Sequence, residues 1–274
     1  MHGADVSTFT IPITRPGARA GLSRRVRLLL TRLGVVVVLL GVWELAYLAH
    51  VLPEVAPDVV QVAVAFGAVL VSGAFWTALG QTVFAALVGW AIAAVLGVVL
   101  GVAIGQSGFF TRSVDVLVEF GRAFPMVALL PMVVLVIGVN ARMEIFMVVL
   151  SCLWPILIQS IVGSRRQDQA VSDTVDVFRI SPLRRFRRVT LPAAMPMIST
   201  GLRIALSIGL LVTVGVGVLS QTPGIGRQIT LAQEASRWDV AFAYIILVGL
   251  VGWGVNSGIA VAERRALRWN RQEA

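Results

Sequence analysis

The sequence predicts an all-α protein that crosses a membrane several times. Of its 274 residues, 57% are hydrophobic and only 14% are charged, whereas soluble domains carry roughly 45–50% apolar and about 25% charged residues. Apolar runs recur along the chain, and most approach the roughly 20 residues that an α-helix needs to span a bilayer. Arginines gather between these runs, which is typical of membrane proteins that obey the positive-inside rule.

Six apolar runs define six expected transmembrane helices. Lipid satisfies no backbone polar group, so spans of this length must be helical. The first run contains Glu44, the second carries no charge, and the fifth tolerates Arg203, which is expected to extend toward the interface. The runs cover residues 33–50, 82–104, 123–139, 145–163, 197–219 and 240–262. Residues 59–72 are weakly amphipathic and predict a further helix on the outer surface.

The arginine distribution predicts the orientation of the chain. Eighteen arginines lie in the N-terminal segment, at Arg112, in the long loop after the fourth run and in the C-terminal segment. Three lie on the opposite side: Arg142, Arg227 and Arg237. Both termini are therefore expected in the cytoplasm. The predicted organisation is a basic N-terminal tail (1–32), a transmembrane domain (33–265) that includes the long loop (164–196), and a C-terminal tail (266–274).

Composition excludes several classes of function. The net charge is +9 and every basic residue is arginine, but these arginines flank apolar runs, so membrane lipid and not nucleic acid is the expected partner. Cys152 is the only cysteine and the two histidines, His2 and His50, are far apart, so neither a disulfide nor a metal site is predicted. A phosphate-binding loop of the form G-x-x-x-x-G-K-[ST] requires lysine. No cofactor is therefore expected on this chain.

The long loop between the fourth and fifth runs carries the most information. It has a helical stretch, a turn near Ser181 and Pro182, and a second helical stretch that is expected to stop at Leu191 and Pro192. Pro192 and Pro196 cannot continue a regular helix without a kink. The pattern predicts a short helix that lies across the membrane face.

This loop resembles the signature loop of binding-protein-dependent ABC importer permeases. The family pattern is Glu-Ala-Ala, three residues and Gly, followed by a Val-x-Leu-Pro-x-Ala-x-Pro ending. Asp173, Thr174 and Val175 stand at the first three positions, and Arg179 replaces the Gly. The second half is matched by Phe186, Arg188, Val189, Leu191, Pro192, Ala194 and Pro196, followed by Gly201, Leu202 and Arg203.

Within that family the chain is similar to the nitrate, taurine and aliphatic-sulfonate branch. The likeness covers roughly residues 52–270 and rests on three motifs: Gly224-Ile225-Gly226, the ending Leu267-Arg268-Trp269-Asn270, and Arg122 with Pro125. Two positions depart from the branch. Gly217 stands where it has an intramembrane Glu, and Val136-Ile137-Gly138 replaces Trp-Phe-Gly.

The resemblance implies a type I ABC importer permease core with a cytoplasmic coupling helix that docks on a separate ATPase. An apolar knob and a charged rim would make this contact. The residues implied are Asp173, Asp176, Arg179, Ile180, Leu183, Phe186 and Arg188. The implied partners are two ABC ATPase subunits that bind ATP and Mg, a second permease, and an extracytoplasmic solute-binding protein. A homodimer of permeases is favoured over a heterodimer, in the plasma (inner) membrane of a bacterium.

Five polar or aromatic side chains within or beside the runs are candidates for the solute pathway, and core packing or interface anchoring is the alternative for each. They are Asn140, Trp154, Gln159, Thr213 and Gln221. Gly97-x-x-x-Gly101 indicates close helix packing.

The implied activity is import of a small anion or small organic solute of the sulfonate, nitrate or taurine kind. A stand-alone secondary transporter is the alternative; such transporters usually need intramembrane carboxylates, and the middles of runs two, three, five and six contain none. A membrane-embedded enzyme would need clustered His, Asp or Glu residues, which the runs do not carry.

Overall fold

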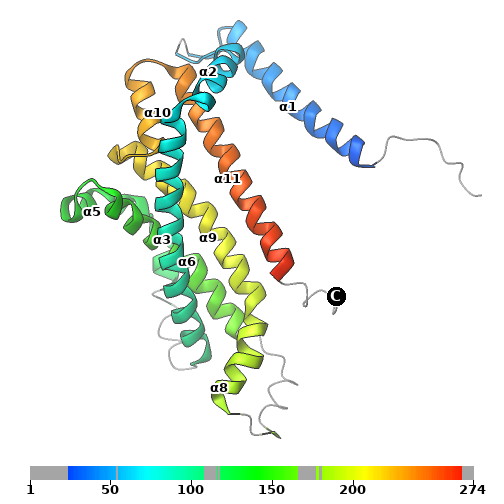
Figure 1. The fold of residues 1–274 in the computed structure, drawn as a ribbon, viewed down its shortest axis with the longest axis vertical. Helices are drawn as coiled ribbons and strands as arrows, with labels where there is room; N and C mark the ends of the chain where they lie inside the picture. The colour runs from blue at the N-terminus through cyan, green and yellow to red at the C-terminus, as the bar shows by residue number, and fades with distance from the viewer. Residues whose placement is uncertain are drawn as a thin grey trace, which may run out of the picture. The chain divides into compact units, whose positions relative to one another are not determined.

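The computed structural model describes residues 24–53, 55–107, 116, 118–165, 177–178 and 181–266, and these are almost entirely helical. Two compact units are present, residues 1–52 and residues 53–274. The elements are α1 (Arg24–Leu48), α2 (Val59–Val71), α3 (Gly73–Gln106), η1 (Met126–Leu129), α5 (Leu130–Ile137), α6 (Ala141–Arg165), α8 (Pro182–Arg185), η2 (Phe186–Thr190), α9 (Leu191–Ser220), α10 (Ile225–Glu234) and α11 (Trp238–Ala266) (Figure 1).

The first unit contains one helix, α1, whose apolar side chains are exposed all around it. Val37, Val38 and Leu39 are between 63% and 66% exposed. A helix that is apolar on every face suits a lipid environment. It begins at Arg24, so residues 24–32, which were assigned to the polar tail, are already helical.

In the second unit, α3 and α6 run parallel and pack along a seam of glycines. A Cβ atom at Gly97 would lie 2.8 Å from Ile156 Cγ2, and one at Gly101 would lie 2.5 Å from Ser160 Cβ. Such distances leave no room for a side chain. The predicted close packing at Gly97 and Gly101 is confirmed, and the seam continues at Gly89, Ala93 and Gly105.

Helix α9 runs antiparallel to α6 and completes a three-helix core, with α3, α6 and α9 side by side (Figure 1). Gly209 lies against Cys152, and the Cys152 thiol donates to the Ala205 carbonyl oxygen over 3.1 Å. Trp90 of α3 donates its indole N–H to the Leu202 carbonyl oxygen over 2.9 Å. These contacts fix the axial register of the three helices.

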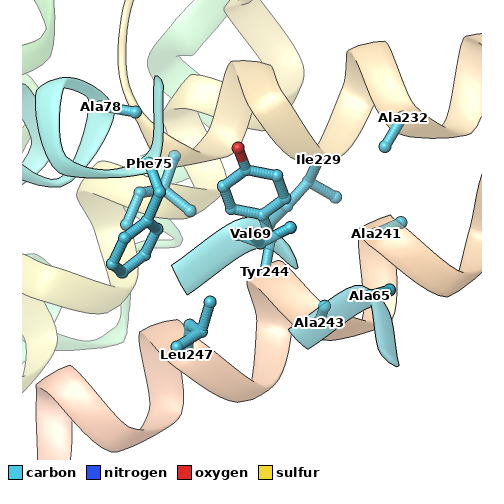
Figure 2. Packing of buried hydrophobic residues seen from close by; sticks show 11 residues of the cluster. Ala65, Val69, Phe75, Ala78, Ile229, Ala232, Ala241, Ala243, Tyr244 and Leu247 are labelled. Carbon is cyan, nitrogen blue, oxygen red and sulfur yellow. The ribbon is translucent and has the colours of Figure 1, made fainter. Parts of the chain in front are cut away.

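A second apolar cluster joins α2, α10, α11 and the start of α3 (Figure 2). Tyr244 lies among the labelled side chains, and its ring centroid is 6.2 Å from that of Phe75 (Figure 2). The Asp58 side chain caps α2 by accepting from the Gln61 N–H, and Ser72 caps α3 by accepting from the Phe75 N–H. The helix predicted over residues 59–72 is confirmed; its place on the outer surface stays a prediction.

Two glycines let α10 cross the end of α9 at close range. A Cβ atom at Gly226 would lie 2.5 Å from the Val214 carbonyl oxygen, and Gly224 has φ 155° and faces the Thr82 hydroxyl. That hydroxyl accepts the Ile225 N–H over 2.9 Å. The Gly-Ile-Gly motif therefore allows two helices to touch backbone to backbone.

Five helices among the described residues are long and apolar enough to cross a membrane, namely α1, α3, α6, α9 and α11. The third apolar run is interrupted. Residues 118–123 are helical, the chain bends at Phe124 before Pro125, and η1 and α5 follow. Proline lacks an N–H and disfavours helical backbone at the residue before it. The count of six spans therefore stays a prediction.

Candidate functional site

The predicted coupling residues fall partly outside the described part of the chain. Asp173, Asp176, Arg179 and Ile180 lie outside the described residues. The backbone of Leu183 belongs to α8. Two further residues lie on η2: the half-buried Phe186 and the exposed Arg188. The coupling role of this set stays a prediction.

Residues 182–220 form one unbroken helical segment. The predicted stop at Leu191 and Pro192 is wrong, because η2 is a π-helix that leads directly into α9. The Leu191 N–H reaches back to the Phe186 carbonyl oxygen, five residues earlier. Pro192 is the second residue of α9 and directly follows the π-turn. The segment that bears the arginines thus continues into a core helix.

Phe186 and Leu191 tie this segment to the C-terminal end of α3. Together with α3 they line an apolar cavity of about 550 Å³. Its remaining walls are Val98, Val99, Val102, Ala103 and Gln106. Buried Ala194 and Ile198 of α9 pack behind Val102 in the same cluster. The arginine-bearing turn therefore rests on both α3 and α9.

A polar contact joins α9 to α11 one to three turns beyond the prolines. The Glu263 carboxylate accepts from the Ser199 hydroxyl over 2.9 Å and lies 3.3 Å from the Arg203 guanidinium. Arg203 thus has a carboxylate partner on the neighbouring helix, and its charge is balanced inside the chain.

Of the five predicted pathway residues, Trp154 lines the cavity of about 370 Å³ that lies beside it. The others make contacts within the fold. Asn140 caps α6 by accepting from the Arg142 and Met143 N–H groups, and the buried Thr213 hydroxyl donates to the Gly209 carbonyl oxygen. Gln221 ends α9 at φ 55° and donates to Glu234. Gln159 packs its Cβ against Gly201.

The cavity beside Trp154 has a volume of about 370 Å³ and lies near the middle of α6 and α9. Ser151, Trp154, Pro155 and Ile158 come from α6, and Ile208 and Val212 come from α9. Gly121 and Arg122 come from the residues just before the third apolar run, and Phe124, Met126 and Val127 come from its start. A Cβ atom at residue 121 would lie 2.2 Å from the Trp154 ring. Gly121 is therefore required for the indole to occupy this place.

The polar groups of this cavity are few. Within the described residues the buried Trp154 Nε1 has no hydrogen-bond acceptor. The Ser151 hydroxyl donates to the Met147 carbonyl oxygen over 2.9 Å. Arg122 pairs with Glu119 three residues earlier, and both side chains are more than half exposed. The cavity is thus lined by one arginine and by mostly apolar side chains.

Sequence reasoning missed two polar residues near this core. Ser151 gives no signal in the sequence, because a single serine is common within an apolar run. In the structure its hydroxyl donates to a backbone carbonyl oxygen of its own helix. Glu144 is only 3% exposed and belongs to the first turn of α6, although the predicted run began one residue after it. A carboxylate at the edge of an apolar run was the available signal for Glu144.

Comparisons with known proteins agree with the helical membrane architecture described above. Residues 93–268 match the family model of the binding-protein-dependent transport system inner membrane component. The aliphatic sulfonates transport permease protein SsuC of Escherichia coli is 32% identical over 233 residues, which cover 85% of this chain and 89% of that protein. The nitrate import permease protein NrtB of Synechocystis is 33% identical over 68% of this chain and 69% of that protein. The taurine transport system permease protein TauC of Escherichia coli is 27% identical over 91% and 92%.

The fold agrees with these matches. An inward-facing structure of the MetNI methionine ABC transporter superposes with a TM-score of 0.55 at 18% identity, covering 71% of this chain and 93% of that chain. The helical core, the arginine-bearing turn that leads into α9 and the family match over most of the chain converge on one assignment. This chain belongs to the binding-protein-dependent transport system inner membrane components and is the permease subunit of an ABC importer.

Proposed function

We propose that this permease forms half of the pathway by which a small anion or small organic solute enters a bacterial cell. Relatives named for aliphatic sulfonates, nitrate and taurine support this solute class. A solute-binding protein delivers the solute from outside. Two separate ABC ATPases bind ATP and Mg and drive transport. The second half of the pathway is another permease, and a second copy of this chain is favoured over a different one.

The single observation that supports the coupling role most strongly is the unbroken helical segment 182–220. Its N-terminal turn carries four arginines at residues 184–188, and its middle lines the cavity at Ile208 and Val212. A continuous helix transmits a push along its axis with little deformation because its backbone hydrogen bonds resist stretching. A displacement imposed by an ATPase at this turn would therefore reach the cavity wall.

The proposed docking surface consists of Asp173, Asp176, Arg179, Ile180, Leu183, Phe186 and Arg188. Apolar side chains would enter a groove on the ATPase, and the charges would ring it. Exposed Arg184, Arg187 and Arg188 support a contact with acidic groups. Rim charges of this kind steer assembly and select the partner more than they tighten it.

Replacement of Leu183 and Phe186 by Asp tests this surface. Burying unpaired carboxylates in the ATPase groove is unfavourable by several kcal/mol, on the order of 2–5 for a buried charge without a partner. ATPase activity that depends on the solute-binding protein should fall at least ten-fold (about 1.4 kcal/mol), while membrane insertion persists. Val55→Asp is the matched control, since Val55 is exposed in a loop far from this segment in sequence. Unchanged coupling in the double variant would refute the docking proposal.

The orientation can be tested separately by cysteine labelling. Native Cys152 is buried and should not react. Arg187→Cys should react only with a reagent admitted to the cytoplasmic side, and Arg237→Cys, whose parent side chain is 62% exposed, only with an impermeant reagent outside. Reversed labelling of this pair would overturn the proposal that both termini are cytoplasmic. Weighing the intact complex distinguishes a single permease mass from two.

A further inference from the structure

We propose that the apolar cavity between the end of α3 and the arginine-bearing turn holds an acyl chain of an anionic phospholipid, with the lipid phosphate at Arg187. The cavity has a volume of about 550 Å³, within the roughly 300–1,000 Å³ typical of small-molecule pockets. It shares no lining residue with the cavity beside Trp154. The inference goes beyond the proposed function, since it concerns the membrane and not the solute.

The cavity opens to the surface of α3. Val99 lines it and is 63% exposed, and Ala103 and Gln106 line it and are exposed as well. Val95 lies one turn before Val99 on the same face of α3 and is 65% exposed. Val102 is buried and forms the floor. The opening therefore continues an apolar strip on a helix that is long enough to span the membrane, and an acyl chain can enter it from the side.

The length of the cavity matches the hydrocarbon depth of one leaflet. Its α3 wall runs from Val98 to Gln106, which is about 12 Å along the axis at about 1.5 Å per residue. The hydrocarbon core of a bilayer is about 30 Å thick, so one leaflet contributes about 15 Å. Gln106 is the last residue of α3, and every other lining residue is apolar. The polar end of the cavity thus coincides with the end of the helix, where head groups are expected.

The π-turn places Arg187 beside the cavity. Phe186 and Leu191 both line the cavity and are joined by the five-residue hydrogen bond of η2, so they lie on one face of the helix. Arg187 directly follows Phe186 and precedes Leu191 by four residues, so it borders that face. The Arg187 side chain is exposed. A guanidinium in this position can donate to a lipid phosphate through two N–H groups while the acyl chain occupies the cavity.

Charge complementarity favours an anionic phospholipid over another protein helix. The turn carries four arginines within residues 184–188, whereas residues 98–107 and 182–198 contain no Asp or Glu. Basic clusters at the ends of membrane helices attract anionic head groups. The same face of a second copy of this chain would bring further arginines to the contact and would be repelled. A lipid phosphate neutralises the charge without requiring a carboxylate from a partner protein.

Lipid titration of the full chain, purified with its ATPase in detergent, tests the site, with native mass spectrometry counting the bound lipids. One phosphatidylglycerol per permease chain should bind at least about ten-fold more tightly than phosphatidylcholine with the same acyl chains. Arg187→Gln should weaken phosphatidylglycerol binding about ten-fold or more, as expected for loss of a hydrogen bond between charged groups. Ala103→Phe places a ring in the cavity and should abolish the tight site.

Matched controls separate the site from general effects. Arg184→Gln removes the same charge from the same turn, but Arg184 lies two residues before Phe186 and does not share its face. Ala91→Phe adds the same bulk at an exposed position of α3 that does not line the cavity. Both controls should leave phosphatidylglycerol binding within about two-fold of the parent, as surface substitutions do.

Three results would overturn the proposal. The first is equal binding of phosphatidylglycerol and phosphatidylcholine, and the second is phosphatidylglycerol binding that neither Arg187→Gln nor Ala103→Phe weakens. The third is dissociation of two permease chains by Ala103→Phe without a change in lipid binding, which would mean that protein covers the cavity. If Ala103→Phe disturbs folding, as read from the melting midpoint, the comparison of Arg187→Gln with Arg184→Gln decides. None of these results would contradict solute import.

Discussion

The glycine seam between α3 and α6 can be tested by adding one methyl group at Gly101. The new Cβ atom would lie 2.5 Å from Ser160 Cβ and 2.7 Å from the Leu157 carbonyl oxygen, whereas carbon contacts are optimal at about 3.5–4.0 Å. The backbone of α6 cannot rotate away as a long side chain can. The two helices must therefore separate by about 1 Å at this level, which forfeits a quarter to a half of each contact's attraction.

The expected size follows from two opposing effects. Overpacking costs about 1–3 kcal/mol, and replacing glycine by alanine within a helix stabilises it by about 1 kcal/mol. Gly101→Ala should therefore range from neutral to about 2 kcal/mol destabilising. Gly80 lies on the same helix and has nothing within 4 Å of its Cβ position. Gly80→Ala should thus be stabilising by up to about 1 kcal/mol.

The difference between the two variants isolates the seam. It amounts to about 1–3 kcal/mol, or roughly 2–12 °C in melting midpoint at about 2–4 °C per kcal/mol. Both proteins should be melted in the same detergent and at one scan rate, because irreversible unfolding makes the midpoint depend on that rate. Circular dichroism at the helical minimum is a suitable signal. Equal midpoints for Gly101→Ala and Gly80→Ala would refute the reasoning.

Further predictions concern buried polar groups, and the same melting measurement checks them. Glu144→Gln should raise the midpoint, because a buried carboxylate without a partner among the described residues is replaced by a neutral group of the same shape; a lower midpoint would mean that the charge is compensated. Glu263→Gln should lower it, since that carboxylate is paired with Arg203, and an unchanged value would contradict the importance of the pair. Thr82→Val should destabilise by about 1–3 kcal/mol, because the buried Ile225 N–H loses its acceptor; a shift within error would show that another acceptor replaces it.

The helices and their close packing were predictable where one physical requirement dominates. The sequence predicts spans over residues 82–104 and 240–262 because lipid tolerates only helices over such apolar lengths. Helix α3 contains the first range and α11 contains the second. Gly97 and Gly101 indicated close packing because small residues four positions apart let two helix backbones approach closely. In each case the residues that impose the requirement lie within one continuous stretch of sequence.

Features that depend on a neighbouring turn were not predictable in this way. Pro192 was expected to end a helix, but it directly follows a π-turn and the helix continues through it. Thr213 was a pathway candidate, yet its hydroxyl bonds to the Gly209 carbonyl oxygen of its own helix. Hydroxyl side chains in helices have this local option. Sequence alone does not reveal which option is used.

Trp154 illustrates a partial success. An aromatic residue in the middle of an apolar run could be recognised as a candidate, and it does line a cavity. Its neighbours could not be recognised, because Gly121 and Arg122 come from a separate segment that lies just before the third apolar run. Their proximity depends on how the chain folds back between that segment and α6, through the bend at Phe124, η1 and α5. The candidate side chain could therefore be identified from the sequence, but its neighbours in space could not.

The π-turn at η2 also has a consequence for how this chain can change over time. Its hydrogen bonds close over five residues, so the turn holds one residue more than an α-helical turn. Deleting a single residue between Phe186 and Thr190 would restore an ordinary α-helical turn with little rotation of the preceding segment relative to α9. A deletion within the regular part of α9 would instead rotate the residues before it by about 100°. The segment should therefore tolerate the loss of one residue at the π-turn better than the loss of one residue farther along α9.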